Sequence, residues 1–148
     1  MPGIVVGVDG SGHSQRALEW AINEAAIRNA PLTVVTVHQL VAGFATRAVP
    51  LEYPGDAELA AKAGQSAKEE ADKILAAMGE SRPASVTIDS RSGFPAEELL
   101  EASKDADMIV LGSRGAGGFS RLLMGAVSSQ VTHHAHCAVV IVPPENRH

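Results

Sequence analysis

The segment Gly112–Ser129 holds the residues best suited to bind a ligand. It is rich in glycine, follows an apolar run and leads into a helical pattern. Glycines leave backbone N–H groups accessible, and the start of a helix adds the positive end of its dipole, so phosphate is the natural ligand. Arg114 and Arg121 add positive charge, and Ser128 and Ser129 add hydroxyl groups. The alternative, that these glycines only form a tight crossover between elements, is less favoured but stays open.

A second candidate is the segment 9–13, Asp-Gly-Ser-Gly-His, which follows the first apolar run. It is not a dinucleotide fingerprint, because Gln15 stands where a third glycine would be, and it lacks the Gly-Lys-Ser/Thr of a P-loop. Asp9 could accept hydrogen bonds from a ribose or from the edge of an adenine. Ser11 and Ser14 can also be interpreted as helix N-caps, and we favour this for Ser14.

Three histidines and the single cysteine lie close together, at His133, His134, His136 and Cys137. Zinc binds imidazole and thiolate, but neighbouring residues on a helix point about 100° apart, and no second group of ligands is evident in the sequence. We favour histidines placed at the C-terminal end of a helix, where the dipole attracts positive charge, and a cysteine that packs as a small apolar residue. We therefore expect no metal site here.

Five β-branched runs predict strands, and four amphipathic patterns between them predict helices. We expect strands at Ile4–Val8, Leu32–His38, Ser85–Asp89, Met108–Leu111 and Ala138–Val142, and helices at Ser14–Asn29, Ala57–Met78, Pro95–Lys104 and Gly125–His136. The alternation predicts an α/β fold with a five-stranded, mainly parallel sheet and helices on both faces. Ligands of such sheets bind outside the carboxyl ends of the strands, where the strand order reverses. Both glycine-rich segments follow strands there, and the long connection Gln39–Asp56 is expected to be functional or mobile.

Composition narrows the class of protein further. The chain has 148 residues, of which 45% are hydrophobic and only 3% aromatic, and its formal net charge is −5. We expect one domain over residues 1–148. The few aromatics and the acidic charge argue against a nucleic-acid partner. One cysteine excludes an intrachain disulfide, and no apolar stretch is long enough to span a membrane, so we expect a soluble cytoplasmic protein.

Several of these motifs together resemble the universal stress protein family. They are Gly112-x2-Gly115-x9-Gly125, the run Val8-Asp9-Gly10-Ser11, Gly93-x-Pro95 and a final Val-Val-Ile-Val-Pro143. The resemblance covers essentially the whole chain and implies the α/β fold of that family, which is similar to adenine nucleotide alpha hydrolases. The three-glycine spacing resembles the ATP-binding branch of the family, so the resemblance implies ATP as the ligand.

The resemblance also implies which residues would bind the nucleotide. Its adenosine part would be contacted by residues at the ends of the first two strands: Asp9, Gly10, Ser11 and the backbone of Val37. Its ribose and phosphates would be contacted by residues of the glycine-rich segment: Gly112, Arg114, Gly115, Gly125, Ala126, Val127 and Ser128. Of these, Gly125 to Ser128 would lie at the N-terminus of a helix.

One residue departs from the family pattern. The family motif usually continues with Ser or Thr after the third glycine, whereas Ala126 follows Gly125 here. A lost hydrogen bond to a charged phosphate would be worth about 1.5–3 kcal/mol, or about ten- to a hundredfold in affinity. Ser128 or Ser129 could compensate, or the preferred ligand could shift to AMP or a cyclic nucleotide.

The sequence offers little that could catalyse a reaction. It has no Gly-x-Ser-x-Gly nucleophile motif, although His13 and His38 near a bound nucleotide make slow ATP hydrolysis conceivable. A magnesium ion could accompany ATP, but only Asp9 and Asp89 would lie near enough to hold it. We therefore expect a nucleotide-responsive stress-response protein, not an enzyme.

We also expect a homodimer paired along the strand Ala138–Val142, because an apolar edge strand left open is an aggregation hazard. The alternative is a nucleotide-independent dimeric interaction module in which the glycine-rich segment is only structural. Ala126 favours this alternative, and the intact three-glycine spacing counts against it.

Overall fold

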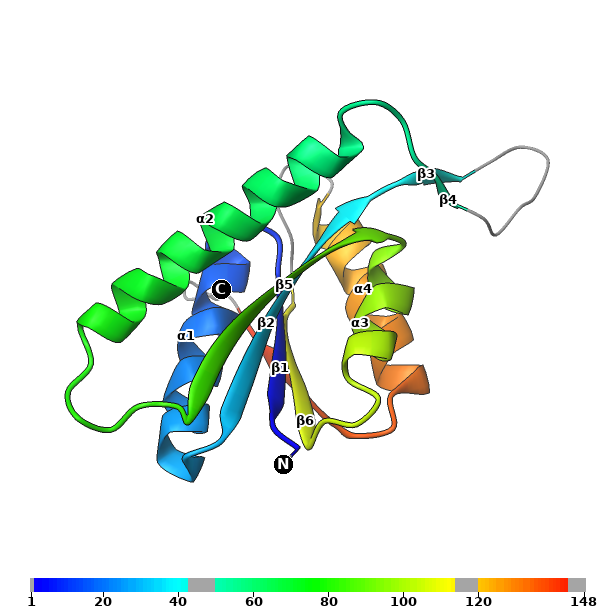
Figure 1. Ribbon diagram of the computed structural model, residues 1–148. Helices are drawn as coiled ribbons and strands as arrows, with labels where there is room; N and C mark the ends of the chain where they lie inside the picture. Colours follow the sequence, from blue (N-terminus) through cyan, green and yellow to red (C-terminus); the bar gives the residue numbers. More distant parts are fainter. Residues whose placement is uncertain (1, 43–49, 114–119, 144–148) are drawn as a thin grey trace.

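The computed structural model describes residues 2–42, 50–113 and 120–143 and confirms the α/β fold (Figure 1). The central sheet consists of β1 (Ile4–Val8), β2 (Pro31–Gln39), β5 (Ser85–Gly93), β6 (Met108–Gly112) and β7 (Ala138–Val142). The helices are α1 (Gly12–Arg28), α2 (Asp56–Ala76), α3 (Pro95–Ala102) and α4 (Ser120–His134). A short antiparallel pair, β3 (Val41–Ala42) and β4 (Pro50–Leu51), lies inside the predicted long connection.

The five strands of the central sheet are parallel and follow the order β5-β2-β1-β6-β7. Helices α1 and α2 lie on one side of the sheet and α3 and α4 on the other (Figure 1). The chain first builds outward from β1 to β5, then returns to add β6 on the other side of β1. The strand order therefore reverses between β1 and β6, which is where ligands of such sheets bind.

Side chains of β1 are buried on both faces of the sheet, as its unbroken apolar sequence predicts. Ile4 and Val6 pack with α1 and α2, whereas Val5 packs in the core on the α3 and α4 side. A Cβ atom at Gly7 would lie 2.8 Å from Leu111 Cδ2. The absence of a side chain at Gly7 therefore lets Leu111, in the core on the α3 and α4 side, pack directly against β1. This close packing fixes the carboxyl end of β1, which leads into the first candidate segment.

The start of α4 corrects one prediction. The helix begins at Ser120, five residues before the predicted Gly125. In an α-helix only the first four N–H groups lack a partner inside the helix. The N–H groups of Gly125 to Ser128 therefore have partners within α4, and the N–H groups without a partner inside the helix belong to its first turn.

The length of β5 corrects another prediction. The strand continues four residues past the predicted end at Asp89 and ends at Gly93. The Ser90 hydroxyl donates to the Ala60 carbonyl at 2.5 Å, and a Cβ atom at Gly64 would lie 3.0 Å from Ser90 Cβ. Helix α2 thus lies close against β5.

No helix in the described ranges has the length and hydropathy that a bilayer span requires.

Candidate functional site

The loop between β1 and α1 is held by hydrogen bonds among its own residues. Asp9 Oδ1 accepts from the Ser11 N–H at 3.0 Å and from the Ser11 hydroxyl at 2.6 Å. Gly10 has a φ of 83°, a left-handed conformation that glycine adopts without strain. The Asp9 side chain is thereby oriented at the carboxyl edge of the sheet, beside the point where the strand order reverses.

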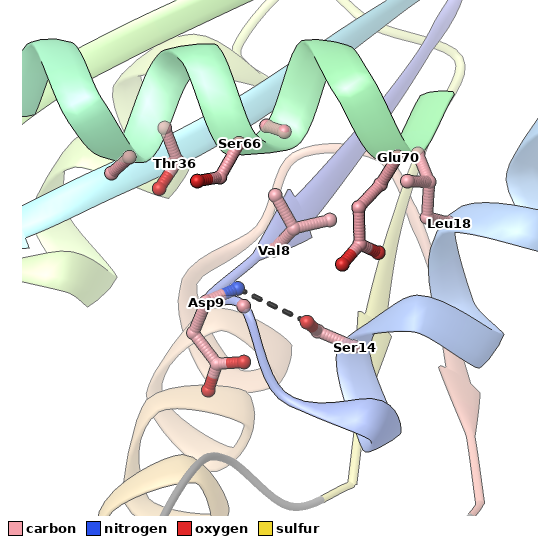
Figure 2. Close-up of a pocket in the computed structure, with 10 residues that line it drawn as sticks. Val8, Asp9, Ser14, Leu18, Thr36, Ser66 and Glu70 are labelled. Atoms are coloured by element: carbon pink, nitrogen blue, oxygen red, sulfur yellow. Dashed lines mark hydrogen bonds between the residues drawn. The ribbon is translucent and has the colours of Figure 1, made fainter. Parts of the chain in front are cut away.

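Ser11, not Ser14, is the N-cap of α1. Its hydroxyl accepts from the Ser14 N–H at 3.2 Å. Ser14 is buried, and its hydroxyl accepts from the Asp9 N–H at 3.1 Å (Figure 2) and donates to the Ser11 carbonyl at 3.1 Å. The preference for Ser14 as the cap was wrong because both serines precede the apolar stripe, and only the turn at Gly10 decides between them.

A cavity of about 220 Å³ opens beside Asp9, between the ends of β1 and β2 and the helices α1 and α2 (Figure 2). Its apolar lining includes Val8, Leu18, Ala63 and Ala67. Its polar lining includes Asp9, Ser14, Thr36, Ser66 and Glu70. Pockets for drug-sized ligands measure about 300–1,000 Å³, so this cavity has room for one part of such a ligand, such as a single heterocycle.

The charges around this cavity limit what it can bind. Its described lining contains two carboxylates, Asp9 and Glu70, and no lysine, arginine or histidine. Carboxylates accept hydrogen bonds from hydroxyl and amino groups and repel anions. The cavity therefore suits the uncharged, hydrogen-bond-donating end of a ligand, and a phosphate would have to lie outside it.

A contact between His38 and Asp56 joins β2 to the start of α2, two of the elements that surround the cavity. His38 Nε2 lies 2.7 Å from Asp56 Oδ1, and both side chains are largely buried, with 22% and 16% of their surface exposed. The Tyr53 N–H donates to the second oxygen of Asp56, and this bond together with His38 lowers the pKa of the Asp56 carboxyl. The start of α2 is thereby tied to the end of β2.

Val37 does not end its strand, since β2 continues to Gln39. Its half-buried side chain packs with the core on the α3 and α4 side, whereas the side chain of its neighbour Thr36 lines the cavity. Only the backbone of Val37 is therefore available toward a ligand on the cavity side, which is the role that the family resemblance implies.

The predicted phosphate side is described only in part. Gly112 is buried at the end of β6, next to β1, and the following residue Ser113 donates its N–H to the Val142 carbonyl at 3.1 Å. Arg114 and Gly115 lie outside the described residues. Within α4, Ala126 is exposed, Val127 is half-buried and Ser128 is buried.

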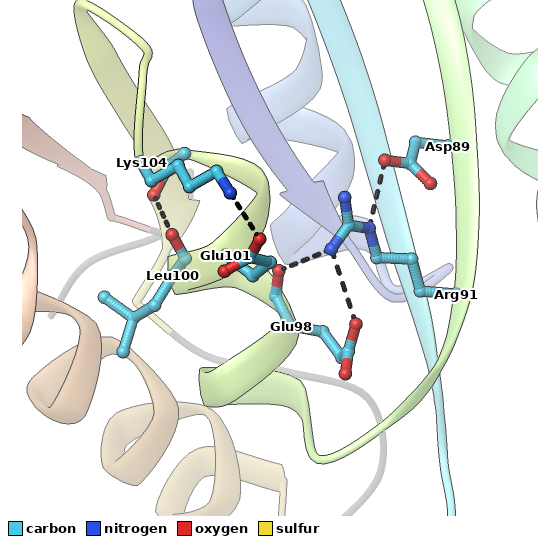
Figure 3. A network of polar contacts seen from close by, with 7 residues as sticks. Asp89, Arg91, Glu98, Leu100, Glu101 and Lys104 are labelled. Atoms are coloured by element: carbon cyan, nitrogen blue, oxygen red, sulfur yellow. Dashed lines mark hydrogen bonds and ion pairs between the residues drawn. The ribbon is translucent and has the colours of Figure 1, made fainter.

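Asp89 lies away from Asp9. Asp89 is on the edge strand β5, which is separated from β1 by β2, and it is in register with Val35 of β2. Its side chain faces α3 (Figure 3). Figure 3 shows Arg91 between Asp89, at 3.0 Å, and Glu98, at 3.4 Å. Arg91 thus joins Asp89 on its own strand to Glu98 on α3, so the Asp89 carboxylate is already paired, two strands away from Asp9. Within residues 2–42, 50–113 and 120–143, no three His, Cys, Asp or Glu side chains gather as metal ligands.

The histidine cluster has the structural arrangement that the sequence favours. His133 and His134 are exposed in the last turn of α4, and His133 Nδ1 lies 3.0 Å from the Ser129 carbonyl oxygen. Burial raises the pKa of the Cys137 thiol, so it stays protonated near neutral pH.

Three residues of the cavity were not singled out from the sequence: Thr36, Ser66 and Glu70. Ser66 and Glu70 follow Ala63 at helical spacing, so both lie next to the alanine stripe by which α2 packs on the sheet. The sequence signal that could have identified Ser66 and Glu70 is their position as polar residues on the border of the apolar stripe of α2. Their meaning depends on α1 and α2 lying side by side, which periodicity along one helix cannot reveal.

Comparison with known proteins places this geometry in a family. The model of the universal stress protein family matches residues 2–143. A universal stress protein of Mycobacterium tuberculosis is 38% identical over 149 residues, covering 95% of this chain and 47% of the relative. Another, from Mycolicibacterium smegmatis, is 34% identical over 147 residues, with the same coverage. The chain thus spans about half the length of these curated relatives.

Solved structures share the fold over nearly their whole length. UspA from Lactobacillus plantarum superposes with a TM-score of 0.75 at 25% identity, covering 95% of this chain and 97% of that one. A universal stress protein solved in complex with cAMP has a TM-score of 0.67 at 25% identity, covering 97% and 98%. Because the family model spans almost all of the sequence and the fold agrees, the chain belongs to the universal stress protein family.

Proposed function

We propose that this protein binds an adenine nucleotide, ATP in the first place, and that occupancy of the site regulates its interactions during stress. The observation that carries the proposal is the cavity beside Asp9, which lies at the ends of β1 and β2, next to the point between β1 and β6 where the strand order reverses. A family member of the same fold was solved in complex with cAMP, which supports an adenine nucleotide as the ligand.

The charges set the direction of the nucleotide in this proposal. The base enters the cavity, and the ribose hydroxyls donate to the Asp9 carboxylate at its edge. The triphosphate, repelled by Asp9 and Glu70, points toward the end of β6 and the first turn of α4. The helix dipole and the N–H groups of that turn, which have no partner inside the helix, favour phosphate.

The family resemblance adds Arg114, Gly115 and the residues Gly125–Ser128 to the phosphate side. Since the N–H groups of Gly125–Ser128 are internal to α4, the first turn from Ser120 replaces them in our proposal. Ala126 supplies no hydroxyl, so AMP or a cyclic nucleotide remains the alternative ligand.

Magnesium, if it accompanies ATP, would be held mainly by the phosphates. Asp9 already accepts two hydrogen bonds from Ser11, and Asp89 is paired with Arg91. Mg²⁺ bound to nucleotides is commonly held by phosphates, water and one or two carboxylates, and Asp9 is the carboxylate nearest this site. We therefore propose binding without rapid hydrolysis.

We further propose a homodimer paired through β7. Along the sequence β7 is entirely apolar, it lies at the edge of the sheet, and Ile141 is 40% exposed. The other edge, β5, carries Asp89 and Arg91 on one face, and charges on an edge strand discourage pairing with a second chain.

The first experiment identifies the nucleotide and tests the phosphate segment. Mass spectrometry of the purified protein should show a bound adenine nucleotide, and ATP should raise the melting temperature of the nucleotide-free protein. Gly115→Trp should abolish this shift, because an indole would fill the space required by the phosphates. Gly79→Trp is the matched control, since apart from its chain neighbours no heavy atom lies within 4 Å of a Cβ placed at this exposed position.

An absence of bound nucleotide, together with no thermal shift at millimolar ATP, AMP or cAMP, would overturn the proposal. The nucleotide-independent interaction module would then be the better description.

A further inference from the structure

We propose that Glu70 determines base specificity by accepting a hydrogen bond from the amino group of the base. This inference rests on the proposed nucleotide site and adds a specificity-determining residue that lies outside the glycine-rich segment and the β1–α1 loop. It follows from the position of the side chain, its lack of other partners and the shape of the cavity.

Glu70 differs from the charged residues around it on α2. Lys68 pairs with Asp72 at 2.8 Å, and Gln65 donates to Glu69 at 3.4 Å, both on the exposed surface of the helix. Glu70 is half-buried and has no hydrogen bond or ion pair with any residue in the described ranges. Figure 2 shows its carboxylate extending from α2 into the cavity.

A second polar group in the cavity also lacks a partner. Thr36 is only 5% exposed, and its hydroxyl makes no hydrogen bond with the part of the chain that the structure describes. No side-chain nitrogen or oxygen in the described ranges is both buried and without a partner, so the Thr36 hydroxyl is open to the cavity, where a ligand can form a hydrogen bond with it. Thr36 and Glu70 both extend into the cavity in Figure 2, with Val8 between them.

The cavity therefore has apolar walls and polar groups that project into it. Val8, Ala63 and Ala67 can pack against the faces of an aromatic ring. The hydroxyls of Thr36 and Ser66 can donate to ring nitrogens, whereas a carboxylate can only accept. A purine with an exocyclic amino group, such as adenine, satisfies all of these groups, and a purine without that amino group leaves Glu70 unpaired.

The test pairs two ligands that differ only in the amino group with variants of Glu70. The affinities of ATP and purine riboside triphosphate, which lacks the 6-amino group, are measured by calorimetry. The wild-type protein should bind ATP about tenfold more tightly, as expected for a hydrogen bond to a charged group. Glu70→Ala should remove this preference, and Glu70→Gln, which keeps an acceptor oxygen, should restore part of it.

Glu69→Ala is the matched control, because it removes an exposed carboxylate from the position directly before Glu70 on the same helix. Its preference for ATP should equal that of the wild type. A merely structural role of Glu70 would change both affinities equally and leave their ratio unaltered.

The outcomes separate this inference from the proposed function. If the wild-type protein binds ATP and Glu70→Ala and Glu70→Gln both keep the full preference for it, the role of Glu70 is wrong and the nucleotide site stands. If the wild-type protein binds neither triphosphate, the proposed function and this inference both fail.

Discussion

At the scale of single residues, the pairing of Asp56 predicts a defined pH dependence of stability. Its carboxyl accepts hydrogen bonds from the Tyr53 N–H and from His38, which lower its pKa below the ordinary value of 3.8. A carboxyl whose pKa is lower in the folded state stabilises the fold above its unfolded pKa, and this contribution is lost as the pH falls through the folded pKa.

The free energy of unfolding of the wild-type protein should therefore exceed that of Asp56→Asn near neutral pH, and the difference should shrink as the pH falls below about 4. Urea titrations across this range measure it. Glu58→Gln, which removes an exposed carboxylate from the same helical turn, should show a much smaller change. A difference between wild type and Asp56→Asn that does not vary with pH would contradict the assignment.

Individual contacts of the site could be predicted only where they are local in sequence. Asp9 and Ser11 were found because a turn with Asp and Gly directly after a strand is recognisable. The pair His38 and Asp56 spans 18 residues, and Glu70 meets Ser14 and Thr36 at the cavity only after α1 and α2 have packed on the sheet. Such contacts depend on tertiary geometry that residue spacing does not contain.

At the scale of elements, α1 packs on the sheet through one face, so substitutions on that face should lower the free energy of unfolding and substitutions on the exposed face should not. Ile22 is completely buried in the core between α1 and the sheet, whereas Ile27 on the same helix is 77% exposed. Ile22→Ala should lower the free energy of unfolding by about 2–5 kcal/mol, because it leaves a cavity in the core.

The matched change Ile27→Ala should alter the free energy of unfolding by no more than about 0.5 kcal/mol. Chemical denaturation of the two variants measures both values. Equal losses in the two proteins would mean that the packed face of α1 has been assigned incorrectly.

Most elements could be predicted because they are apolar and regular. Strand β1 has the expected bounds, Ile4–Val8, since all of its residues except the half-buried Val8 are buried. The errors fall where this signal fails. The end of β5 carries Ser90, Arg91 and Ser92, which an edge strand tolerates, and the short strands β3 and β4 have too few residues to show a pattern. The glycines before α4 suggested a later helix start than Ser120.

At the scale of the whole molecule, the two edges of the sheet differ in a way that predicts the assembly. Ile141 on β7 is exposed without belonging to either core cluster, so Ile141→Lys should disrupt pairing along β7 with little loss of folding. Light scattering should show a dimer for the wild-type protein and a monomer for this variant.

Thr87→Lys places the same charge at an exposed position of the opposite edge strand, β5, and should leave the dimer intact. A dimer that survives Ile141→Lys but is lost in Thr87→Lys would place the interface at β5 instead.

The central claim is that an adenine nucleotide binds at the carboxyl edge of the sheet beside Asp9. The most direct test is an amide NMR titration of the nucleotide-free protein with ATP. We predict shifts concentrated at Asp9, Gly10, Thr36 and Ala63–Glu70, with little change at the amino ends of the strands around Gly3 and Thr33. Spectra that do not change at millimolar ATP, or shifts confined to the amino ends, would contradict the claim.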